Sequence, residues 1–383
     1  MKIMTMLGTR PEIIRLSLII HFLDRFTDKH WLVHTGQNFE EKLSSIFFCQ
    51  LGIREPDLYM TVQGSSFAQQ AAQVLEKSEA LLLEHRPDRL LVLGDTNSGL
   101  AAIVARRLGI PVYHLEAGTR SFDDRVAEEV NRRIIDHAST VLMPYTRLGR
   151  DNLLAEGFRA NQIYVTGNPL KQVIDRYGKE IAASNALDHN QLTQGQYFLA
   201  IFSRPENVDR EDRLRQLISV VAQLHRQYGY PIIVSVHPRT RSAMKRLGME
   251  LEEFGVRFME PMGFFDFTLL EKNAFCLLSD SSTVQEEACL FGVPSVTLRE
   301  ATERPETIEC GANLLSGMDP AGFTRAVSQV VEQRGAWRVP AEYLSPFVAE
   351  TVCKIMLGYR SADSSELAWR EAAKRLESDL VPR

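Results

Sequence analysis

Short apolar runs alternate with longer amphipathic stretches along nearly all of this 383-residue chain. Apolar runs of about four to eight residues are typical of buried strands, and apolar positions spaced three or four apart are typical of helices. In the first half, the helices predicted between strands include Pro11–Arg25, Ser66–Glu84 and Asn97–Leu108. The predicted strands are Lys2–Leu7, His30–His34, Arg89–Leu93, Val112–Leu115, Thr140–Met143 and Ile163–Val165, and in the second half Tyr197–Phe202, Ile232–Ser235, Val256–Met259, Phe275–Leu278 and Ser295–Leu298.

This regular alternation predicts an α/β fold in which parallel sheets are covered by helices on both faces. Because the chain is too long for one ordinary core, we expect two Rossmann-like domains. Residues 1–168 would form the first, joined by C-terminal helices at about 346–375, and residues 169–345 the second. The polar stretch 183–196 is expected just after the crossover between them. Two such domains facing each other would leave a cleft between their strand ends.

The two ends of the chain bear on targeting and processing. The apolar stretch in MKIMTMLGTR is too short for a signal peptide, and no run is long enough to span a bilayer, so we expect a cytoplasmic protein. Residues 376–383, LESDLVPR, contain the left half of a protease site used to remove tags. We therefore expect them to be a tag remnant outside the fold.

Composition excludes several partners. A net charge of −5 with 24% charged residues favours neither nucleic acid nor a membrane surface. The five cysteines are odd in number, scattered and without CxxC spacing, which indicates reduced thiols. No histidine or cysteine pattern indicates a metal site, and no GxGxxG or P-loop indicates a dinucleotide or ATP, so no metal and no cofactor are expected.

Acidic residues follow two neighbouring predicted strands in the first half. Asp95 comes after the apolar run LLVL, and Glu116 comes after PVYHL. Glu128 and Arg132 open the next predicted helix. Ligands bind at this edge of an open α/β sheet. Carboxylates that gather there repel one another and lose solvent, which raises at least one pKa and suits proton transfer.

Basic and hydroxyl-rich loops follow other predicted strands. Arg10 lies in GTRPE, Arg204 in SRPEN and Arg304 in TERPE, while His237 opens HPRTR. The segment LSDSSTVQEEA starts a helix whose free backbone N–H groups could take a phosphate. Each loop alone is as readily a solvated turn or a helix cap. Together they favour an anionic ligand such as a diphosphate, because the planar arginine fork binds two oxygens at once.

In this order, the motifs GTRPEIIR, HTGQN, LGDTNS, HLEAGTR, EEVNRR, VTGNP, DSSTVQEEA and TERPE resemble the non-hydrolysing UDP-N-acetylglucosamine 2-epimerase family. The resemblance implies a glycosyltransferase-B-like arrangement, a homodimer, and a UDP-linked N-acetylhexosamine bound in the cleft. It implies C2 deprotonation, loss of UDP to give a 2-acetamidoglycal, and re-addition of UDP. Asp95, Glu116, Glu128 and Arg132 would be catalytic, with the first two as the proton-transfer pair. UDP would be held by Arg10, Arg15, Ser203, Arg204, His237, Phe267, Ser281, Ser282, Glu287 and Arg304.

Details of these motifs are similar to the branch that makes UDP-N-acetyl-L-fucosamine, by 2-epimerisation of UDP-2-acetamido-2,6-dideoxy-L-talose for surface polysaccharide precursors. The substrate expected is that compound or UDP-GlcNAc. Ser203 stands where the family usually has histidine, Ser282 where it has glycine, and Arg15 where lysine is frequent. Asn38 stands in the histidine position of HTGQH, which bears on activation by substrate.

Two other functions remain open at this point. A glycosyltransferase on the same scaffold would also use Glu287 for the ribose, but the acids around Asp95 argue against it. A weakly active UDP-sugar-binding protein is suggested by Ser203, because a hydroxyl cannot carry a proton at neutral pH as histidine does.

Overall fold

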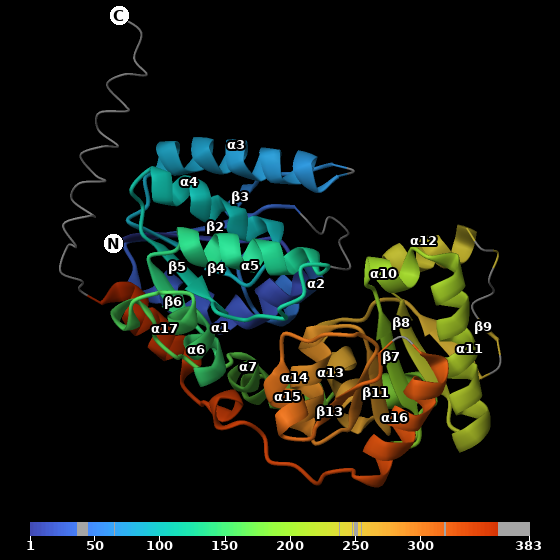
Figure 1. Ribbon diagram of the computed structural model, residues 1–383. Coiled ribbons are helices and arrows are strands. Elements are labelled where there is room, and N and C mark those ends of the chain that lie inside the picture. Colours follow the sequence, from blue (N-terminus) through green and yellow to red (C-terminus); the bar gives the residue numbers. More distant parts are fainter. Residues whose placement is uncertain are drawn as a thin grey trace, which may run out of the picture. The chain divides into compact units, whose positions relative to one another are not determined.

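The computed structural model describes residues 1–36, 45–64, 66–236, 238–246, 248, 252–253, 255–317 and 319–358. The chain separates into two compact units, Met1–Val173 with the segment from Leu344 onward, and Ile174–Tyr343. Figure 1 shows a sheet flanked by helices in each unit. The expected fold class, α/β with two Rossmann-like halves, is confirmed.

The first unit holds a six-stranded sheet in the order β3-β2-β1-β4-β5-β6. Every pair in it is parallel, as between β1 and β2 and between β1 and β4. The sheet switches direction between β1 and β4, and such a switch point is where open α/β sheets bind ligands. The strands are β1 Lys2–Leu7, β2 Lys29–His34, β3 Leu58–Tyr59, β4 Arg89–Leu93, β5 Val112–Leu115 and β6 Val141–Met143.

Helices cover both faces of this sheet because its strands are apolar on both sides. On one face lie α3, α4 and α5 (Figure 1). Their apolar residues form one cluster with Met4, Met6 and Val92. On the other face α17 packs along α1, and the Cys353 thiol lies 3.8 Å from the Ile19 carbonyl oxygen. The helices are α1 Arg10–Phe26, α2 Ser45–Gln50, α3 Phe67–His85, α4 Ala101–Arg107, α5 Ala127–Ala138, α6 Arg147–Ala155, α7 Leu170–Arg176 and α17 Val348–Leu357.

The second unit repeats the same winding. Its seven-stranded sheet has the order β13-β12-β11-β7-β8-β10-β9, with a switch point between β7 and β11. Only the short edge strand β9 runs antiparallel, beside β10, among the pairs described. The strands are β7 Phe198–Phe202, β8 Ile232–Val236, β9 Glu252–Glu253, β10 Val256–Met259, β11 Cys276–Ser279, β12 Ser295–Thr297 and β13 Asn313–Leu315.

Two apolar clusters again fill the two faces of the sheet. Helices α11 and α16 contribute to the cluster on one face, around Phe198 and Val234. Helices α9, α13 and α14 contribute to the cluster on the other, around Leu199 and Leu277. The helices are α8 Gly178–Ala182, α9 Ala186–His189, α10 Pro205–Val208, α11 Glu211–Tyr228, α12 Pro238–Arg246, α13 Phe264–Asn273, α14 Ser282–Phe291, α15 Pro305–Glu309 and α16 Pro320–Glu332.

Three sequence-based assignments need correction. The predicted strand Ile163–Val165 is only an isolated parallel bridge between Ile163 and Leu142, and the backbone turns at Gly167 with φ 88°. The helix predicted at Asn97–Leu108 is a short 3-10 turn, Asn97–Leu100, followed by α4. The short strands β3, β9 and β13 were not predicted. The C-terminal helix expected to about residue 373 is described to Leu357, and the rest lies outside the described residues.

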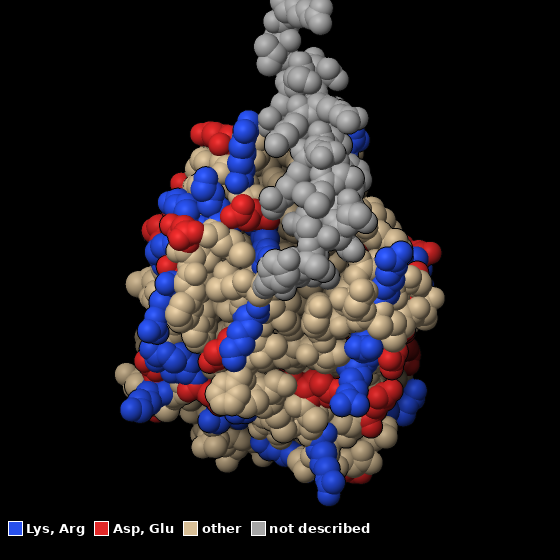
Figure 2. Space-filling view, turned by 90° about the vertical axis from the view of Figure 1, so that its left-hand side faces the viewer, with Lys and Arg blue, Asp and Glu red and all other residues tan. Residues whose placement is uncertain are grey.

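Charged side chains of both signs are interspersed over the face drawn in Figure 2. Within the described ranges, no helix is both long enough and apolar enough to cross a bilayer.

Candidate functional site

In the first unit, the predicted site residues lie on the turns that follow β1, β4 and β5. Arg10 is the first residue of α1, directly after β1. Asp95 follows β4 through Gly94, which has φ 68°. Glu116 follows β5. Because β1, β4 and β5 are adjacent in the sheet, their carboxyl ends bring these turns to one edge.

A buried carboxylate that was not among the predicted site residues joins two of these turns. Glu12 Oε2 accepts hydrogen bonds from the Gly8 and Thr9 backbone N–H groups at 3.0 and 2.8 Å. Its Oε1 accepts from the Thr96 hydroxyl at 2.9 Å, beside Asp95. Burial raises the pKa of Glu12 to about 7, although these hydrogen bonds act to lower it. The capping box Thr9–Glu12 in the sequence was the signal that could have identified this residue.

Glu116 occupies a strained and enclosed position. Its backbone has φ 71°, which is uncommon for a residue other than glycine. The side chain is buried, with Oε2 3.9 Å from Arg15 Nη1. Gly94 lies beside this carboxylate, and its φ of 68° rather than a lack of space favours glycine there. The fold therefore uses backbone strain to hold an acid against an arginine, and strain of this kind clusters at functional sites.

Asp95 is bound to α5 by two contacts. Its Oδ2 lies 2.6 Å from Arg132 Nη2, and its carbonyl oxygen accepts from Asn131 Nδ2 at 3.0 Å. Arg132 also contacts Glu129, with 2.8 Å between Nη1 and Oε2. Glu128 lies in the first turn of α5, four residues before Arg132 and so on the same face of the helix.

Glu129 organises the loop that leads into α5. It is fully buried and accepts from the Ser121 backbone N–H and hydroxyl at 2.9 and 3.0 Å. Hydrogen bonds from Ser121 and the charge of Arg132 hold its pKa below the usual range, against the raising effect of burial. Sequence reasoning did not assign it a site role, although it stands next to Glu128.

A second buried network supports the β4 turn from beneath. Both ring nitrogens of His114 lie 2.8 Å from an acceptor, one from Asp136 Oδ1 and the other from the Gly94 carbonyl oxygen. Arg120 Nη2 lies 2.7 Å from Asp136 Oδ2. These neighbours hold the pKa of the fully buried Asp136 below its usual range although burial opposes them.

Arginines therefore lie between the acids of this edge, where the sequence suggested carboxylates repelling one another. Arg15 faces Glu116, and Arg132 lies between Asp95 and Glu129. The carboxyl whose pKa burial raises is Glu12, in the turn after β1. Such an edge can hold a neutral or anionic group while keeping carboxylates ready to accept a proton.

In the second unit, Asp280 joins two turns at the switch point through hydrogen bonds, as Glu12 does in the first unit. It follows β11, is fully buried, and accepts from the backbone N–H groups of Ser203 and Arg204, which follow β7, at 3.0 Å each. Asn207 Nδ2 donates to the same carboxylate at 2.9 Å. Burial raises the pKa of Asp280 against the effect of these hydrogen bonds. The predicted residues Ser203 and Arg204 are thus fixed through their backbone.

The predicted helix start after β11 is present. Ser281 is the N-cap residue of α14, and its side chain makes no capping hydrogen bond. Ser282 is the first residue of the helix, so backbone N–H groups of the first turn are available to an anion there. Glu287 lies further along the same helix and is buried.

The arginines of the second unit are arranged around buried acids. Arg304 is bonded through Nε to Glu286, and its side chain is 4% exposed. Glu303 receives two arginines, Arg299 at 2.8 Å and Arg204 at 3.6 Å. Two guanidinium groups therefore share the one carboxylate of Glu303. Arg299 and Glu303 were not predicted, and the basic residue directly after the β12 run was the signal for Arg299.

The remaining predicted residues are placed as follows. Phe267 lies on α13 in the apolar cluster around Leu270 and is 6% exposed. His237 lies outside the described residues. Asn38 does so as well.

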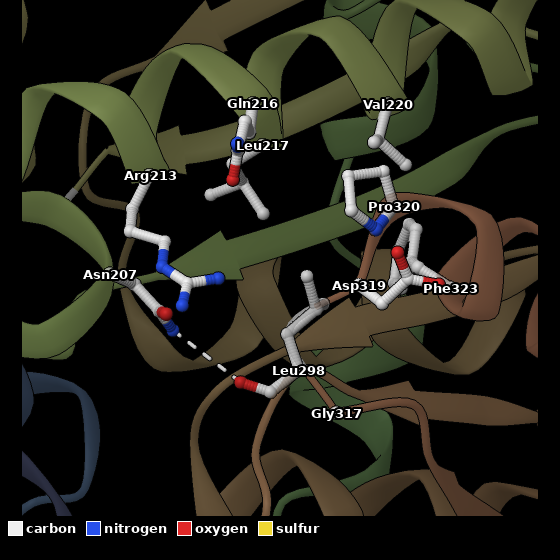
Figure 3. A pocket seen from close by; sticks show the side chains of 10 residues that line it. All are labelled: Asn207, Arg213, Gln216, Leu217, Val220, Leu298, Gly317, Asp319, Pro320 and Phe323. Atoms are coloured by element: carbon white, nitrogen blue, oxygen red, sulfur yellow. Dashed lines mark hydrogen bonds between the residues drawn. The ribbon is translucent and has the colours of Figure 1, made fainter.

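Two cavities lie near these elements. In the first unit, a pocket of about 280 Å³ is lined by Thr35, Val62, Gln63, Gly64, Gln70, Val74 and Asn97. Its amide groups can donate to and accept from a polar ligand. In the second unit, a pocket of about 20 Å³ lies between α11 and α16. Figure 3 shows Arg213 and Asn207 approaching Leu298 in its lining. That volume holds about one water molecule, so it is no site for a sugar.

Comparison with known proteins places these features in a family context. A family model described as UDP-N-acetylglucosamine 2-epimerase matches residues 23–357. A Methanocaldococcus jannaschii protein described as UDP-N-acetylglucosamine 2-epimerase is 39% identical over 348 residues, covering 89% of this chain and 95% of that protein. A Pseudomonas aeruginosa protein described as UDP-2,3-diacetamido-2,3-dideoxy-D-glucuronate 2-epimerase is 37% identical over 321 residues, covering 83% and 88%.

A solved structure is similar in fold over most of the chain. It is the crystal structure of M. jannaschii UDP-GlcNAc 2-epimerase in complex with UDP-GlcNAc and UDP. The match has a TM-score of 0.88 at 36% identity and covers 93% of this chain and 99% of that chain.

Proposed function

This chain belongs to the UDP-N-acetylglucosamine 2-epimerase family and is an isomerase, and from that premise we propose which sugar it acts on and how. The proposed reaction inverts C2 of a UDP-linked 2-acetamido sugar. The observation that carries the proposal is the edge after β4 and β5, where Asp95 and Glu116 are each paired with an arginine.

In the proposed mechanism a carboxylate of this edge removes the C2 proton. The electron pair forms the C1–C2 double bond, and the C1–O bond to UDP breaks, leaving a 2-acetamidoglycal and UDP. UDP oxygen then re-adds to C1 while a second acid delivers a proton to the opposite face of C2. Opposite faces require two acid/base groups, and general acid–base catalysis is worth about 10²–10⁴ in rate.

We assign these two roles to Asp95 and Glu116. Both are held by buried or nearly buried arginines, which keep the carboxylates oriented. Glu128 and Arg132 share a face of α5 and would orient the sugar. The developing charge on UDP would be stabilised by Arg10 and by the arginines after β7 and β12, because preorganised donors act most strongly on charge that forms in the transition state.

UDP itself would bind at the switch point of the second unit. The diphosphate would lie at the start of α14, at Ser281 and Ser282, and would be contacted by the guanidinium groups of Arg204 and Arg299, which share Glu303. Glu287 would accept the ribose hydroxyls, and Phe267 would contact the uracil. Arg304 would act through Glu286, since that pair is buried.

For the substrate we propose UDP-2-acetamido-2,6-dideoxy-L-talose ahead of UDP-GlcNAc. The family branch that uses it is the one that LGDTNS, TRSFDD and MGFFDF resemble. The relatives named above for UDP-N-acetylglucosamine and for a diacetamido glucuronate indicate that similar chains accept different sugars at this site.

The test is solvent exchange. Incubation with each UDP-sugar in D₂O should place deuterium at C2, seen by NMR, and the rate should be highest with the L-talose compound. If only UDP-GlcNAc exchanges, the proposed substrate is wrong and UDP-GlcNAc takes its place, while the proposed reaction stands. No deuterium at C2 of either candidate substrate, or of UDP-2,3-diacetamido-2,3-dideoxy-D-glucuronate, would contradict the epimerase mechanism.

A further inference from the structure

Two cysteines far apart in the sequence meet in the second unit. Cys289 lies near the end of α14, and Cys310 directly follows α15. Their sulfur atoms are 3.7 Å apart, within reach of a thiol hydrogen bond. This pair could not be predicted from the sequence, because 21 residues separate the two positions and no CxxC spacing is present.

The surroundings of the pair make the two thiols unequal. Cys289 is fully buried beside Tyr343 and Trp337, and the Trp337 Nε1–H donates to its carbonyl oxygen at 3.3 Å. Cys310 is partly exposed, so a small solute can reach it. The hydrogen bond from Cys289 and nearby backbone N–H groups lower the pKa of the Cys310 thiol, while the same hydrogen bond and burial raise that of Cys289.

We propose that Cys289 and Cys310 form a reversible disulfide when the protein meets a peroxide. A disulfide bond is about 2.05 Å long, so the sulfurs must approach by roughly 1.7 Å, a distance that side-chain rotation and a small backbone shift can supply. A reachable thiolate beside a second thiol is the usual arrangement of a redox-sensitive site.

Peroxide would oxidise the pair in two steps. The Cys310 thiolate attacks one peroxide oxygen, the O–O bond breaks, and Cys310 becomes a sulfenic acid while the other oxygen leaves as water after taking up a proton. The Cys289 sulfur then attacks the sulfenic sulfur, and the displaced hydroxyl leaves as water with the thiol proton. Two thiols lose two electrons and the peroxide is reduced to two water molecules. A dithiol reverses the bond.

The disulfide would link α14, whose first turn is part of the proposed UDP site, to α15. Glu287 lies two residues before Cys289 on α14, and Glu286 is already bonded to Arg304 at the start of α15. Drawing Cys289 toward Cys310 would therefore shift the turn that carries Glu287. This consequence rests on the proposed UDP site. We expect UDP affinity to fall by roughly fivefold or more, the low end of typical coupling between two sites.

The experiment treats the full chain with hydrogen peroxide and counts thiols by alkylation and intact mass. The wild-type chain and Cys49→Ser, which removes an exposed cysteine, should each lose two thiols to one linked peptide pair, Cys289 with Cys310, and recover them with dithiothreitol. Cys289→Ser should stop at a sulfenic acid on Cys310 that dimedone traps. Cys310→Ser should leave Cys289 unmodified.

A linked pair involving any other cysteine, or further oxidation of Cys310 with no link, would overturn the proposal. Calorimetry with UDP on the reduced and oxidised chains then tests the coupling separately. If the reduced and oxidised chains bind UDP equally well, the disulfide proposal stands but its effect on α14 is contradicted. A reduced chain that fails to bind UDP would instead remove the proposed UDP site, whatever the thiols do.

Discussion

Both sheet edges contain a buried carboxylate that bridges two turns, but different residues surround it. In each unit a buried carboxylate crosses the switch point, Glu12 from the turn after β1 to that after β4, and Asp280 from the end of β11 to the turn after β7. Around Glu12 the fold gathers further carboxylates with arginines between them. Around Asp280 it gathers serines, a helix start and arginines that are themselves paired with buried acids.

The difference indicates a division of work. Carboxylates held at fixed positions can move a proton, which the first edge requires. Backbone N–H groups and guanidinium groups bind a diphosphate but cannot accept a proton at neutral pH, which suits the second edge. The carboxylates Glu12 and Asp280 each hold the two turns at their own switch point.

The largest effect should come from removing a proton carrier of the first edge. Asp95→Asn and Glu116→Gln should each lower kcat by about 10²–10⁴, because general acid–base catalysis contributes that much. UDP affinity should change little, since the second edge is intact. Steady-state assays and C2 deuterium exchange would measure the first effect, and calorimetry the second.

The matched control for these variants is Glu84→Gln, an exposed acid on α3 that should leave both quantities unchanged. Loss of UDP affinity equal to the loss of kcat would show that the two edges do not divide the work as we argue.

Asp280→Ala should be the most destabilising change of the second edge. It leaves the Ser203 and Arg204 backbone N–H groups and the Asn207 amide without their acceptor. Buried donors left unsatisfied cost about 1–3 kcal/mol each, so the free energy of unfolding should fall by at least about 3 kcal/mol. Urea denaturation followed by circular dichroism would measure it, and UDP affinity should fall too, because the turn after β7 is released.

Asp212→Ala is the control, an exposed acid paired with Arg210 at 2.7 Å that should have little effect on unfolding. Equal stabilities of the two variants would contradict the role given to Asp280.

Glu12 predicts a pH dependence of stability. Its pKa in the folded protein is raised to about 7 from 4.5, so the folded state holds the proton longer than the unfolded state. The contribution of Glu12 to stability is therefore fully present below pH 4.5 and is lost as pH rises through about 7, by about 3 kcal/mol. Glu12→Gln has no such proton. The stability of the wild-type chain relative to this variant should fall across that window.

Urea denaturation at several pH values would measure the difference between the two chains, in which other titrating groups cancel. A difference that stays constant, or rises with pH, would mean that the hydrogen bonds at Glu12 outweigh burial and keep it ionised.

Much of the fold could be predicted from the sequence, because parallel strands buried on both faces appear as uninterrupted apolar runs. Strands β1, β4, β5 and β10 have the predicted limits. Strands β3 and β13, with two and three residues, are too short to give such a run. Ile163–Val165 gives one, but it makes only one bridge at the edge of the sheet.

The candidate site residues could be located because their motifs follow predicted strands. What could not be predicted is which groups contact which. The contact from Thr96 to Glu12 spans 84 residues and that from Ser203 to Asp280 spans 77. These contacts depend on strand order at the switch point, which apolar periodicity does not specify. The buried pair of Arg304 with Glu286 was hidden for the same reason.

The smallest expected effect tests whether the second edge can share the chemistry. Ser203 is fixed through its backbone N–H, so Ser203→His leaves the Asp280 contact in place. An imidazole there, with an ordinary pKa of about 6.5, would add a proton carrier near the diphosphate. Turnover should rise by about tenfold, worth roughly 1.4 kcal/mol, and the pH–rate profile should gain an inflection near that pKa. Ser203→Asn, similar in size but without a titrating group, should give neither change. Equal gains in both variants would indicate that the side chain's shape matters rather than its proton, and unchanged turnover in both would leave proton transfer to the first edge alone.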